Sequence, residues 1–237
     1  MNKEQQIILY GYQKTRSGEH PRKFIKDYKG ICVTDGYQVY HTVEKRMDDL
    51  TIAGCWVHCR RGFDDAMQTI AKEHQKESIS YLIMKQIQAI YREEGKLKDL
   101  SARERRMQRQ VVVKPLVDAL FAYLKQNEPL IERKGTLRAA FTYALNQEKY
   151  LRVFLSDGEV PIDNNASERA IRGFCIGRKN WQMNFHIEAF GPFYKSSVLT
   201  YVYTACLSSW TGLSLCLKES LYVLNWKSLI SFPSVGY

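Results

Sequence analysis

Apolar residues near the start of the chain form short runs, and this pattern predicts strands with a helix between them. Residues 7–10 (IILY) and 31–34 (ICVT) are compact apolar runs bounded by polar residues or glycine. Residues 22–29 lie between them and are predicted to form a short helix that ends at Gly30. A further strand is predicted over residues 50–57. Strand, helix and strand in this order are typical of an α/β sheet.

The middle of the chain has a different period. From residue 62 to residue 91 the apolar residues recur every three or four positions, which predicts helix throughout. A second helix is predicted to open at Pro115, and a third over residues 137–145. The charged stretch 96–109 is interpreted as a solvated helix, with contact to DNA as the alternative. Its arginines are Arg103, Arg105, Arg106 and Arg109.

The pattern changes again after Trp181. Between residues 184 and 237 charged residues are few, and there is neither a helical nor an alternating apolar stripe. We interpret this tail as a sequence that was not selected for the same fold as the rest. The alternative is a pair of apolar C-terminal helices that pack on the core.

Composition narrows the class of protein. A chain of 237 residues accommodates one domain, or one domain with an insertion. The net charge of +10 and the isoelectric point near 9.3 favour a polyanionic partner. Six scattered cysteines and an N-terminus without a signal-peptide pattern predict a reduced, cytoplasmic protein. No charge-free apolar run is long enough for a membrane span.

Asp35 is the first candidate for chemistry. It directly follows the predicted strand 31–34, and open α/β sheets bind ligands at the carboxyl ends of their strands. A carboxylate there suits a metal ion. The alternative is that Asp35 and Gly36 simply form a turn.

Glu168 is the second candidate. Asn165 is a suitable helix N-cap, and Glu168 follows it at the spacing of a capping box. One interpretation is a capping glutamate beside solvated arginines. The other is a metal-binding carboxylate beside a strip that grips nucleic-acid phosphates. The nearby cations are Arg169, Arg172, Arg178 and Lys179.

His58, Arg60 and Arg61 follow the strand predicted over residues 50–57. We interpret them as facing the same cleft as Asp35, where they would contact DNA. The alternative is that the two arginines open the next helix as solvated residues. Cys55 and Cys59 flank His58, but no second Cys/His pair follows at a matching spacing, so a structural zinc site is not supported.

Six blocks of sequence together resemble the catalytic region of transposases of the insertion sequence 66 family. They occur in the family's order and span the chain from about residue 7 to residue 181. The blocks are 9–13 (LYGYQ), 33–40 (VTDGYQVY), 54–61 (GCWVHCRR), 143–146 (YALN), 162–172 (IDNNASERAIR) and 177–181 (GRKNW).

The resemblance implies an α/β fold, namely a ribonuclease-H-like domain that carries an Asp-Asp-Glu triad. Enzymes of this family are bacterial, and they cut and join DNA. Such enzymes bind two divalent metals, Mg²⁺ or Mn²⁺. Asp35 matches the second catalytic and metal-binding acid, and Glu168 matches the third. The helical block between them matches an insertion that such domains carry. The implied layout is a partial core over 1–61, the insertion over 62–158, the third-acid helix over 159–183 and a divergent tail over 184–237.

The chain also departs from the family. The family's first catalytic Asp and its N-terminal DNA-binding regions would fall before Met1. In a ribonuclease-H-like sheet the first strand is central, and the second lies between it and the third. Residues 7–10 would be the third strand, left without its usual neighbour. We therefore expect a transposase fragment, inactive alone, or alternatively a non-catalytic DNA-binding protein. Either could form a homo-oligomer or assemble with a full-length transposase.

Overall fold

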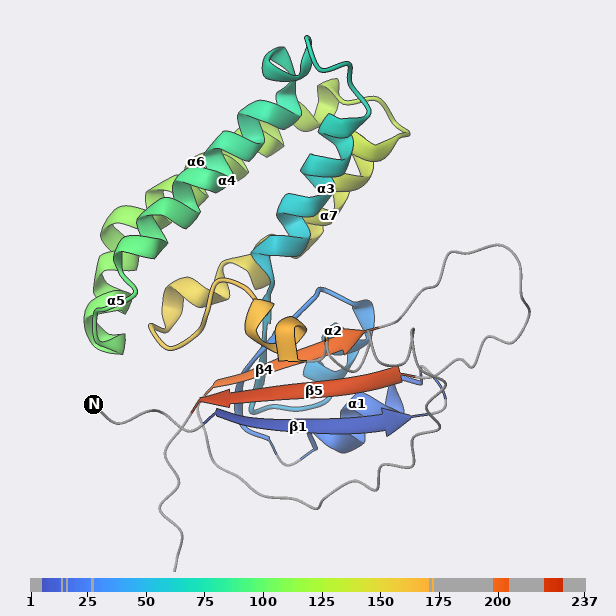
Figure 1. Ribbon diagram of the computed structural model, residues 1–237, viewed down its shortest axis with the longest axis vertical. Helices are drawn as coiled ribbons and strands as arrows, with labels where there is room; N and C mark the ends of the chain where they lie inside the picture. The colour runs from blue at the N-terminus through green and yellow to red at the C-terminus, as the bar shows by residue number, and fades with distance from the viewer. Residues whose placement is uncertain are drawn as a thin grey trace, which may run out of the picture. The chain divides into compact units, whose positions relative to one another are not determined.

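The computed structural model describes residues 6–13, 15, 17–26, 28–170, 172, 198–204 and 220–227. The chain is a mixed α/β protein, mostly helical, and it divides into two compact units (Figure 1). The sheet unit comprises residues 1–52 and 164–237, and the helical unit comprises residues 53–163. The chain therefore leaves the sheet unit within its third strand and returns just before the Glu168 helix.

The sheet unit contains a five-stranded sheet in the order β1-β5-β4-β2-β3. β1 is antiparallel to β5, β5 is antiparallel to β4, and β4 is parallel to β2. In this register Ile31 of β2 lies opposite Val198 of β4. The strands are β1 (Gln6–Gln13), β2 (Gly30–Thr34), β3 (Leu50–Gly54), β4 (Val198–Thr204) and β5 (Ser220–Lys227).

The order of strands corrects two expectations. The strand predicted at residues 7–10 is present, but β1 is not left without a neighbour, because β5 pairs along it from Gln6 to Gln13. The alternative of an apolar helix pair in the tail is wrong for residues 198–204 and 220–227, which form strands. β1 is therefore the edge strand of the sheet, and the tail supplies its backbone partner.

Two short helices, α1 (Glu19–Phe24) and α2 (Gln38–Glu44), pack against each other in the sheet unit. α1 begins three residues earlier than predicted and ends at Phe24, where the Ile25 amide bonds to the Pro21 carbonyl. Apolar side chains from both helices' segments and from β2 and β3 form the core. The most deeply buried are Ile25, Cys32, Val33, Tyr40, Val43, Leu50 and Ile52.

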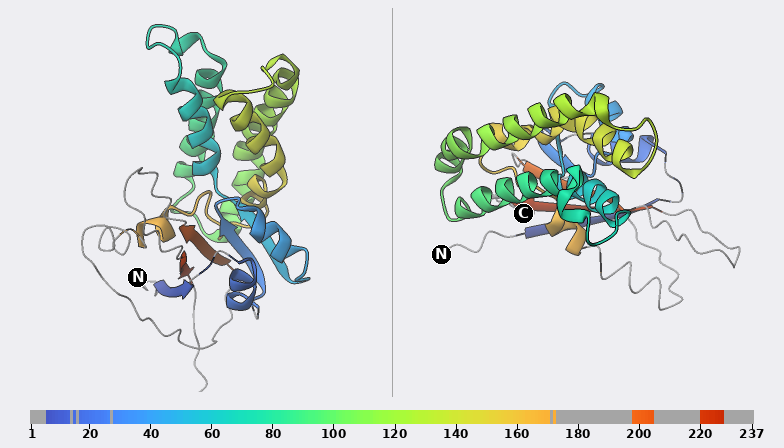
Figure 2. Two further views of the ribbon diagram at one scale, coloured as in Figure 1. Left: turned by 90° about the vertical axis from the view of Figure 1, so that its right-hand side faces the viewer. Right: turned by 90° about the horizontal axis from the view of Figure 1, so that it is seen from above.

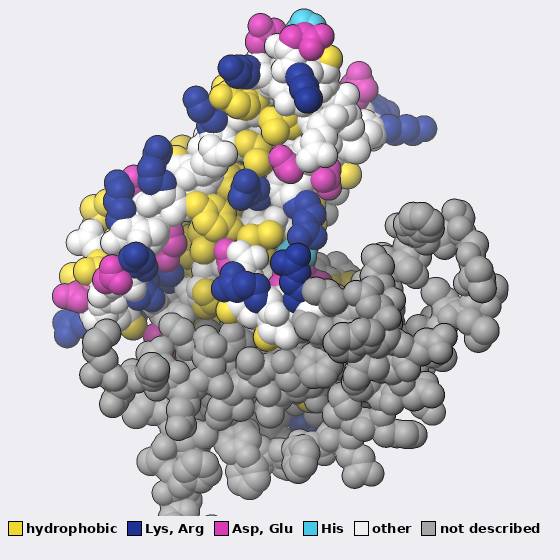
Figure 3. Space-filling model, in the orientation of Figure 1, with side chains coloured by type: hydrophobic (Ala, Val, Ile, Leu, Met, Phe, Trp, Pro, Cys, Tyr) yellow, Lys and Arg dark blue, Asp and Glu magenta, His cyan; other side chains and the backbone are white. Residues whose placement is uncertain are grey.

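The helical unit is built on α3 (Trp56–Gln68), α4 (Ile79–Lys96), α6 (Lys114–Asn127) and α7 (Thr136–Leu151) (Figure 2). α3 packs on α4 and α7, and α6 packs on the same two helices. α3 and α7 approach closely at Gly62, where a Cβ atom would lie 3.2 Å from the Cβ of Ala140. Hydrophobic side chains gather between α3 and α4, with charges of both signs around them (Figure 3).

Two predicted boundaries in this unit are wrong. The apolar run 50–57 does not stay extended, because β3 ends at Gly54 and Trp56 opens α3. The Trp56 indole is fully buried and donates to the Leu151 carbonyl at 2.9 Å. The helix predicted over 62–91 is two helices, since α3 ends at Gln68 and the Ser78 hydroxyl caps α4 at the Tyr81 amide.

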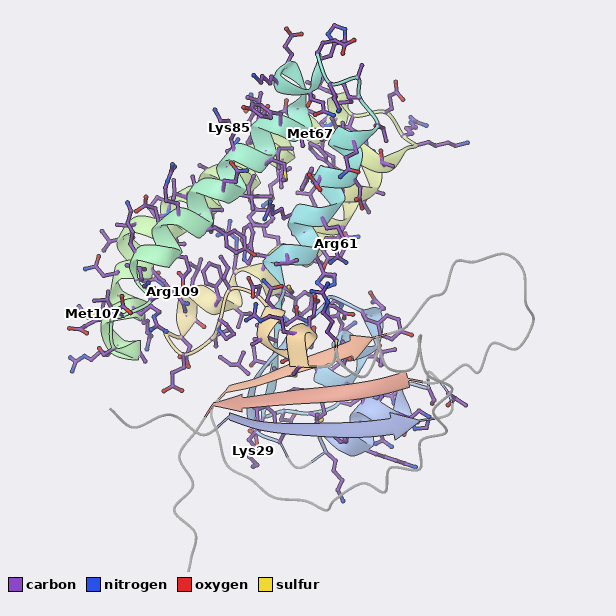
Figure 4. The ribbon with its side chains drawn as sticks, viewed as in Figure 1. Lys29, Arg61, Met67, Lys85, Met107 and Arg109 are labelled. Carbon is purple, nitrogen blue, oxygen red and sulfur yellow. The ribbon has the colours of Figure 1, made fainter. Side chains whose placement is uncertain are left out.

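The charged stretch 96–109, which was predicted to be a solvated helix, is partly buried. It forms α5 (Ala102–Gln108) and the π-helical turn η2 (Arg109–Val113). Arg109 is 1% exposed, pairs with Glu94, and donates to carbonyl groups of the segment that follows α7, which Figure 4 shows it facing. Arg105 donates to the Gly158 carbonyl at 2.9 Å. These two arginines are therefore structural, and neither is free to contact DNA.

The same segment approaches α5 so closely that only glycine fits at position 158. A Cβ atom there would lie 1.8 Å from the Ala102 carbonyl oxygen. The segment itself contains the short helix η4 (Val153–Ser156), and the connections elsewhere contain η1 (Gln75–Glu77) and η3 (Glu128–Leu130). Among the helices of the described ranges, none combines the length and apolar character that a bilayer span requires.

Candidate active site

Asp35 lies where the sequence predicts, immediately after β2. Its Oδ1 atom accepts a hydrogen bond from the Tyr37 amide at 3.0 Å. Gly36 makes this turn possible with a φ of 82°, a conformation that residues with a Cβ rarely adopt. Asp35 is therefore a turn residue and also a carboxylate held at the end of a buried strand.

Two effects disfavour the charged form of Asp35. Burial, which is the larger cause, and the Glu168 carboxylate together raise its pKa to about 6, while the Tyr37 amide acts in the opposite direction. A charge shifts a pKa in this way only at short range. Two acids far apart in the sequence are therefore brought together within the sheet unit.

The helix that carries Glu168 begins one residue earlier than predicted. Its first helical residue is Asn165, so the cap is Asn164, whose carbonyl accepts the amides of Ser167 and Glu168 at 3.0 and 3.1 Å. Asn164 and Ser167 are fully buried. Glu168 thus lies at the end of the first turn, and its backbone is anchored by a buried residue.

The donor set suits a divalent cation. Mg²⁺ and Mn²⁺ favour carboxylate oxygens, and a cation between Asp35 and Glu168 would offset both the burial of the first charge and its repulsion by the second. Within the described ranges no three His, Cys, Asp or Glu side chains meet as a metal site. These two carboxylates are the residues that could hold such an ion.

The predicted basic residues near residue 60 belong to α3, not to the end of a strand. Arg60 and Arg61 are exposed, and the described residues offer neither of them an ion pair (Figure 4 labels Arg61). Burial and the charge of Arg61 lower the pKa of His58 to about 4. His58 is consequently neutral near pH 7, so the two arginines are the cations of this group.

The basic strip beside Glu168 is described only in part. Arg169 and Arg172 lie on the Glu168 helix and are exposed. Arg178 and Lys179 lie outside the described residues, as does Trp181.

Comparison with known proteins gives the family. A family profile described as "Transposase IS66 family" matches residues 1–190. The chain belongs to this family. No solved structure significantly matches it.

Three uncharacterized proteins of Sinorhizobium fredii are relatives of this IS66-family chain. It is 30% identical to y4hP over 183 residues, which are 73% of this chain and 33% of y4hP. It is 29% identical to y4qI over 180 residues, covering 73% and 32%, and 27% identical to y4jD over 178 residues, covering 73% and 34%. The IS66-family chain thus spans about a third of the length of these relatives.

Within the helical unit of this IS66-family chain, a contact between two residues is not singled out by the sequence pattern. Tyr91 fits the pattern only as an apolar position of a helix, yet its hydroxyl lies 3.4 Å from Asp163 Oδ2. Asp163 belongs to the block 162–172 and has no separate signal of its own. The feature of the sequence that could have indicated this contact is the hydroxyl of Tyr91 at an otherwise apolar position of the helix.

Proposed function

We propose that this chain carries part of the catalytic centre of a DNA transposase, in which Asp35 and Glu168 hold a divalent metal ion. The observation that supports the proposal is the placement of both acids in the sheet unit: Asp35 follows β2 in a turn held by the Tyr37 amide, and Glu168 lies in the first turn of its helix, where its charge disfavours that of Asp35. Membership of the IS66 transposase family points to DNA as the substrate.

Each residue has a defined part in this proposal. The Tyr37 amide holds Asp35 Oδ1, so the orientation of that carboxylate is set before any ion binds. Asp35 is ionised above a pH of about 6 and is then a ligand. Glu168 contributes the second carboxylate from the first turn of its helix. The bound metal, Mg²⁺ or Mn²⁺, supplies Lewis-acid chemistry at a DNA phosphodiester.

The chain alone is proposed to bind metal weakly and to leave DNA uncut. Family chemistry uses two ions held by three acids, and accurate placement of the reacting groups accounts for much of the rate. Two carboxylates offer fewer bonds to fix an ion. The third acid would come from outside the described residues of this chain.

We further propose that the sheet unit is a ribonuclease-H-like core and that the helical unit is its insertion. In such a core two strands lie between the third strand and the strand that ends in the second acid. Here β5 and β4 lie between β1 and β2, with β4 parallel to β2, and this order supports the proposal. Neither tail strand contains Asp or Glu, so neither would supply the first acid.

A second candidate function is a non-catalytic DNA-binding protein that assembles with a full-length transposase and lowers its activity. The exposed Arg60 and Arg61, and the chain's net charge of +10, favour it. Affinity for a DNA duplex would fall steeply with salt and would not require Mg²⁺. The change Arg61→Gln would reduce the slope of log affinity against log salt by about 1.

Calorimetric titration with Mn²⁺ at pH 7.5 tests the first proposal. The unmodified chain is expected to bind, and Asp35→Asn and Glu168→Gln should each weaken binding at least about tenfold, the loss expected for a removed ligand. Asp48→Asn is the control, because Asp48 is an exposed acid of the same unit. Binding that survives both substitutions would overturn the proposed site, and salt-sensitive DNA binding without metal binding would favour the second candidate.

A further inference from the structure

The helices α5 and α6 carry a row of apolar residues that faces away from the core of the helical unit. Met107 is 62% exposed and Val111 is 69% exposed (Figure 4 labels Met107). Pro115, Ala119 and Ala122 continue the row along α6 and are also exposed. Because α5, η2 and α6 follow one another directly, these five residues form one surface, which we call the outer face.

A second row of residues shows that the outer face lies opposite the core. Arg109, Val113 and Val117 follow one another at a spacing of four residues, and each is at most 1% exposed. They are offset by two positions from Met107 and Val111, and two residues turn an α-helix by about 200°. The buried row therefore packs against the rest of the helical unit, whereas the outer face is left to solvent.

Charge is absent from the outer face and is neutralised beside it. None of its five residues is ionisable. Lys114 lies 2.7 Å from Asp118, which also contacts Arg152, and Lys125 lies 2.7 Å from Glu148. The charged side chains of α6 are thus paired within the chain. An exposed apolar surface with no charge at its centre is typical of a contact between proteins.

The charge of the chain indicates which partner fits. A DNA backbone requires cations on the surface that it meets, and the outer face has none. Two copies of this chain, each with a net charge of +10, repel one another, so a contact between them is favoured where unpaired cations are few. The exposed Arg103 and Arg106 lie at one end of the face, and Glu128, with a side chain 46% exposed, follows the other end. An antiparallel arrangement places the arginines of one copy beside Glu128 of the other.

We propose that the outer face is the contact surface between two copies of this chain, which pack α5 and α6 antiparallel about a two-fold axis. This inference goes beyond the proposed metal site and does not depend on it. A strip about 22 Å long and one helix, about 10 Å, wide covers less than the roughly 800 Å² per partner of a standard interface. The expected dimer is therefore weak, and it forms as the concentration of the chain rises.

Sedimentation velocity at chain concentrations from roughly 1 to 300 µM tests the contact. The unmodified chain is expected to shift from monomer to dimer across this range. Val111→Glu places an unpaired charge in the contact and should weaken association at least about tenfold. Its midpoint of urea unfolding should not change, because Val111 is exposed in the monomer. An unmodified chain that stays monomeric throughout would overturn the inference.

Leu82→Glu is the matched control for the position of the contact. Leu82 is an apolar residue of α4 that is 44% exposed and lies outside the outer face. Its replacement should leave association unchanged. Equal weakening by Leu82→Glu and Val111→Glu would contradict the assignment of the contact to the outer face.

A mixture of two variants tests whether the partner is a second copy. Val111→Glu and Val111→Lys should each be monomeric alone, because like charges then meet across the two-fold axis. Val111 lies near the middle of the outer face, so the two copies of this residue lie close to that axis. An equimolar mixture should therefore associate at least about tenfold more tightly than either variant alone. No gain in the mixture would rule out a second copy as the partner.

Discussion

Each unit of the protein withdraws a charged side chain from solvent, Arg109 fully and Asp35 in part, and the two charges have different surroundings. In the helical unit, Arg109 pairs with Glu94 and donates to the carbonyl groups of Phe154 and Val160. In the sheet unit, Asp35 accepts the Tyr37 amide, but burial and Glu168 both disfavour its charge.

The difference distinguishes a charge with a structural role, Arg109, from a charge suited to a functional site, Asp35. A buried charge that is paired and hydrogen-bonded holds its neighbours in place, and its removal leaves those neighbours without a partner. A buried carboxylate beside a second carboxylate opposes folding, and such groups concentrate at functional sites. The helical unit thus satisfies its buried Arg109, whereas the sheet unit retains the partly buried Asp35 carboxylate at a cost in stability.

Removal of the tail should have the largest effect on stability, and it should destabilise only the sheet unit. A chain that ends at Met183 lacks β4 and β5, so β1 and β2 lose the partners with which they pair. We expect Cys32 and Val33 to lose protection from hydrogen exchange, while Ile87 in the helical unit keeps it. A chain that ends at Lys227 is the control, because it retains β5. Continued protection of Val33 without the tail would contradict the observed strand order.

Replacement of Arg109 should have the next largest effect, this time in the helical unit. Arg109→Met leaves the Glu94 carboxylate and several carbonyl groups without their donor, and we expect the free energy of unfolding to fall by about 3–5 kcal/mol. Urea denaturation followed by circular dichroism measures it. Arg106→Met changes an exposed arginine of α5 and should remain within about 0.5 kcal/mol of the unmodified protein. Equal losses in the two variants would show that Arg109 has no special role.

Removal of the charge at Asp35 should stabilise the sheet unit. The folded-state pKa of about 6 lies above the ordinary value of 3.8, so folding favours the protonated acid. Stability therefore increases as the pH falls from about 6 towards 4, and is lowest above pH 6. Asp35→Asn keeps an acceptor for the Tyr37 amide and should add about 1–3 kcal/mol at pH 7.5.

Urea unfolding of the metal-free protein between pH 4 and pH 8 measures this effect. Asp48→Asn, an exposed acid in the same unit, should retain the pH dependence of the unmodified chain. A loss of stability in Asp35→Asn at pH 7.5 would mean that the carboxylate is better satisfied than burial and Glu168 imply.

A fall in pH should lower the stability of the helical unit, whereas it raises the stability of the sheet unit, and the change should be smaller. The pKa of His58 is lowered from 6.5 to about 4, so folding favours the neutral ring. Its contribution to stability is complete above pH 6.5 and is lost as the pH falls towards 4. His58→Gln should reduce this acid-side loss by about 1–2 kcal/mol. The measurement is unfolding at pH 4.5 and pH 7.5, and His74→Gln, an exposed histidine, should change neither value.

Local pattern was sufficient for several elements and for the placement of Asp35. The apolar run that ends in Asp-Gly predicted β2 and the carboxylate after it, because burial and a turn are both encoded within a few residues. Pro115 predicted the start of α6, since proline is suited to a first helical turn. Local pattern wrongly predicted that β3 continues beyond Gly54. The chain turns there because Gly54 and Trp56 pack against Leu151, which is 95 or more positions away in the sequence.

By itself, then, the sequence determined the family, the alternation of strands and helices, and two acids in positions suited to chemistry. Tertiary structure decided which elements meet: β5 beside β1, Arg109 inside the helical unit, Glu168 near Asp35, and Tyr91 on Asp163. The physical reason is that a residue's preference for strand or helix depends on its near neighbours. A buried charge or a strand neighbour depends on chain segments that only folding brings together.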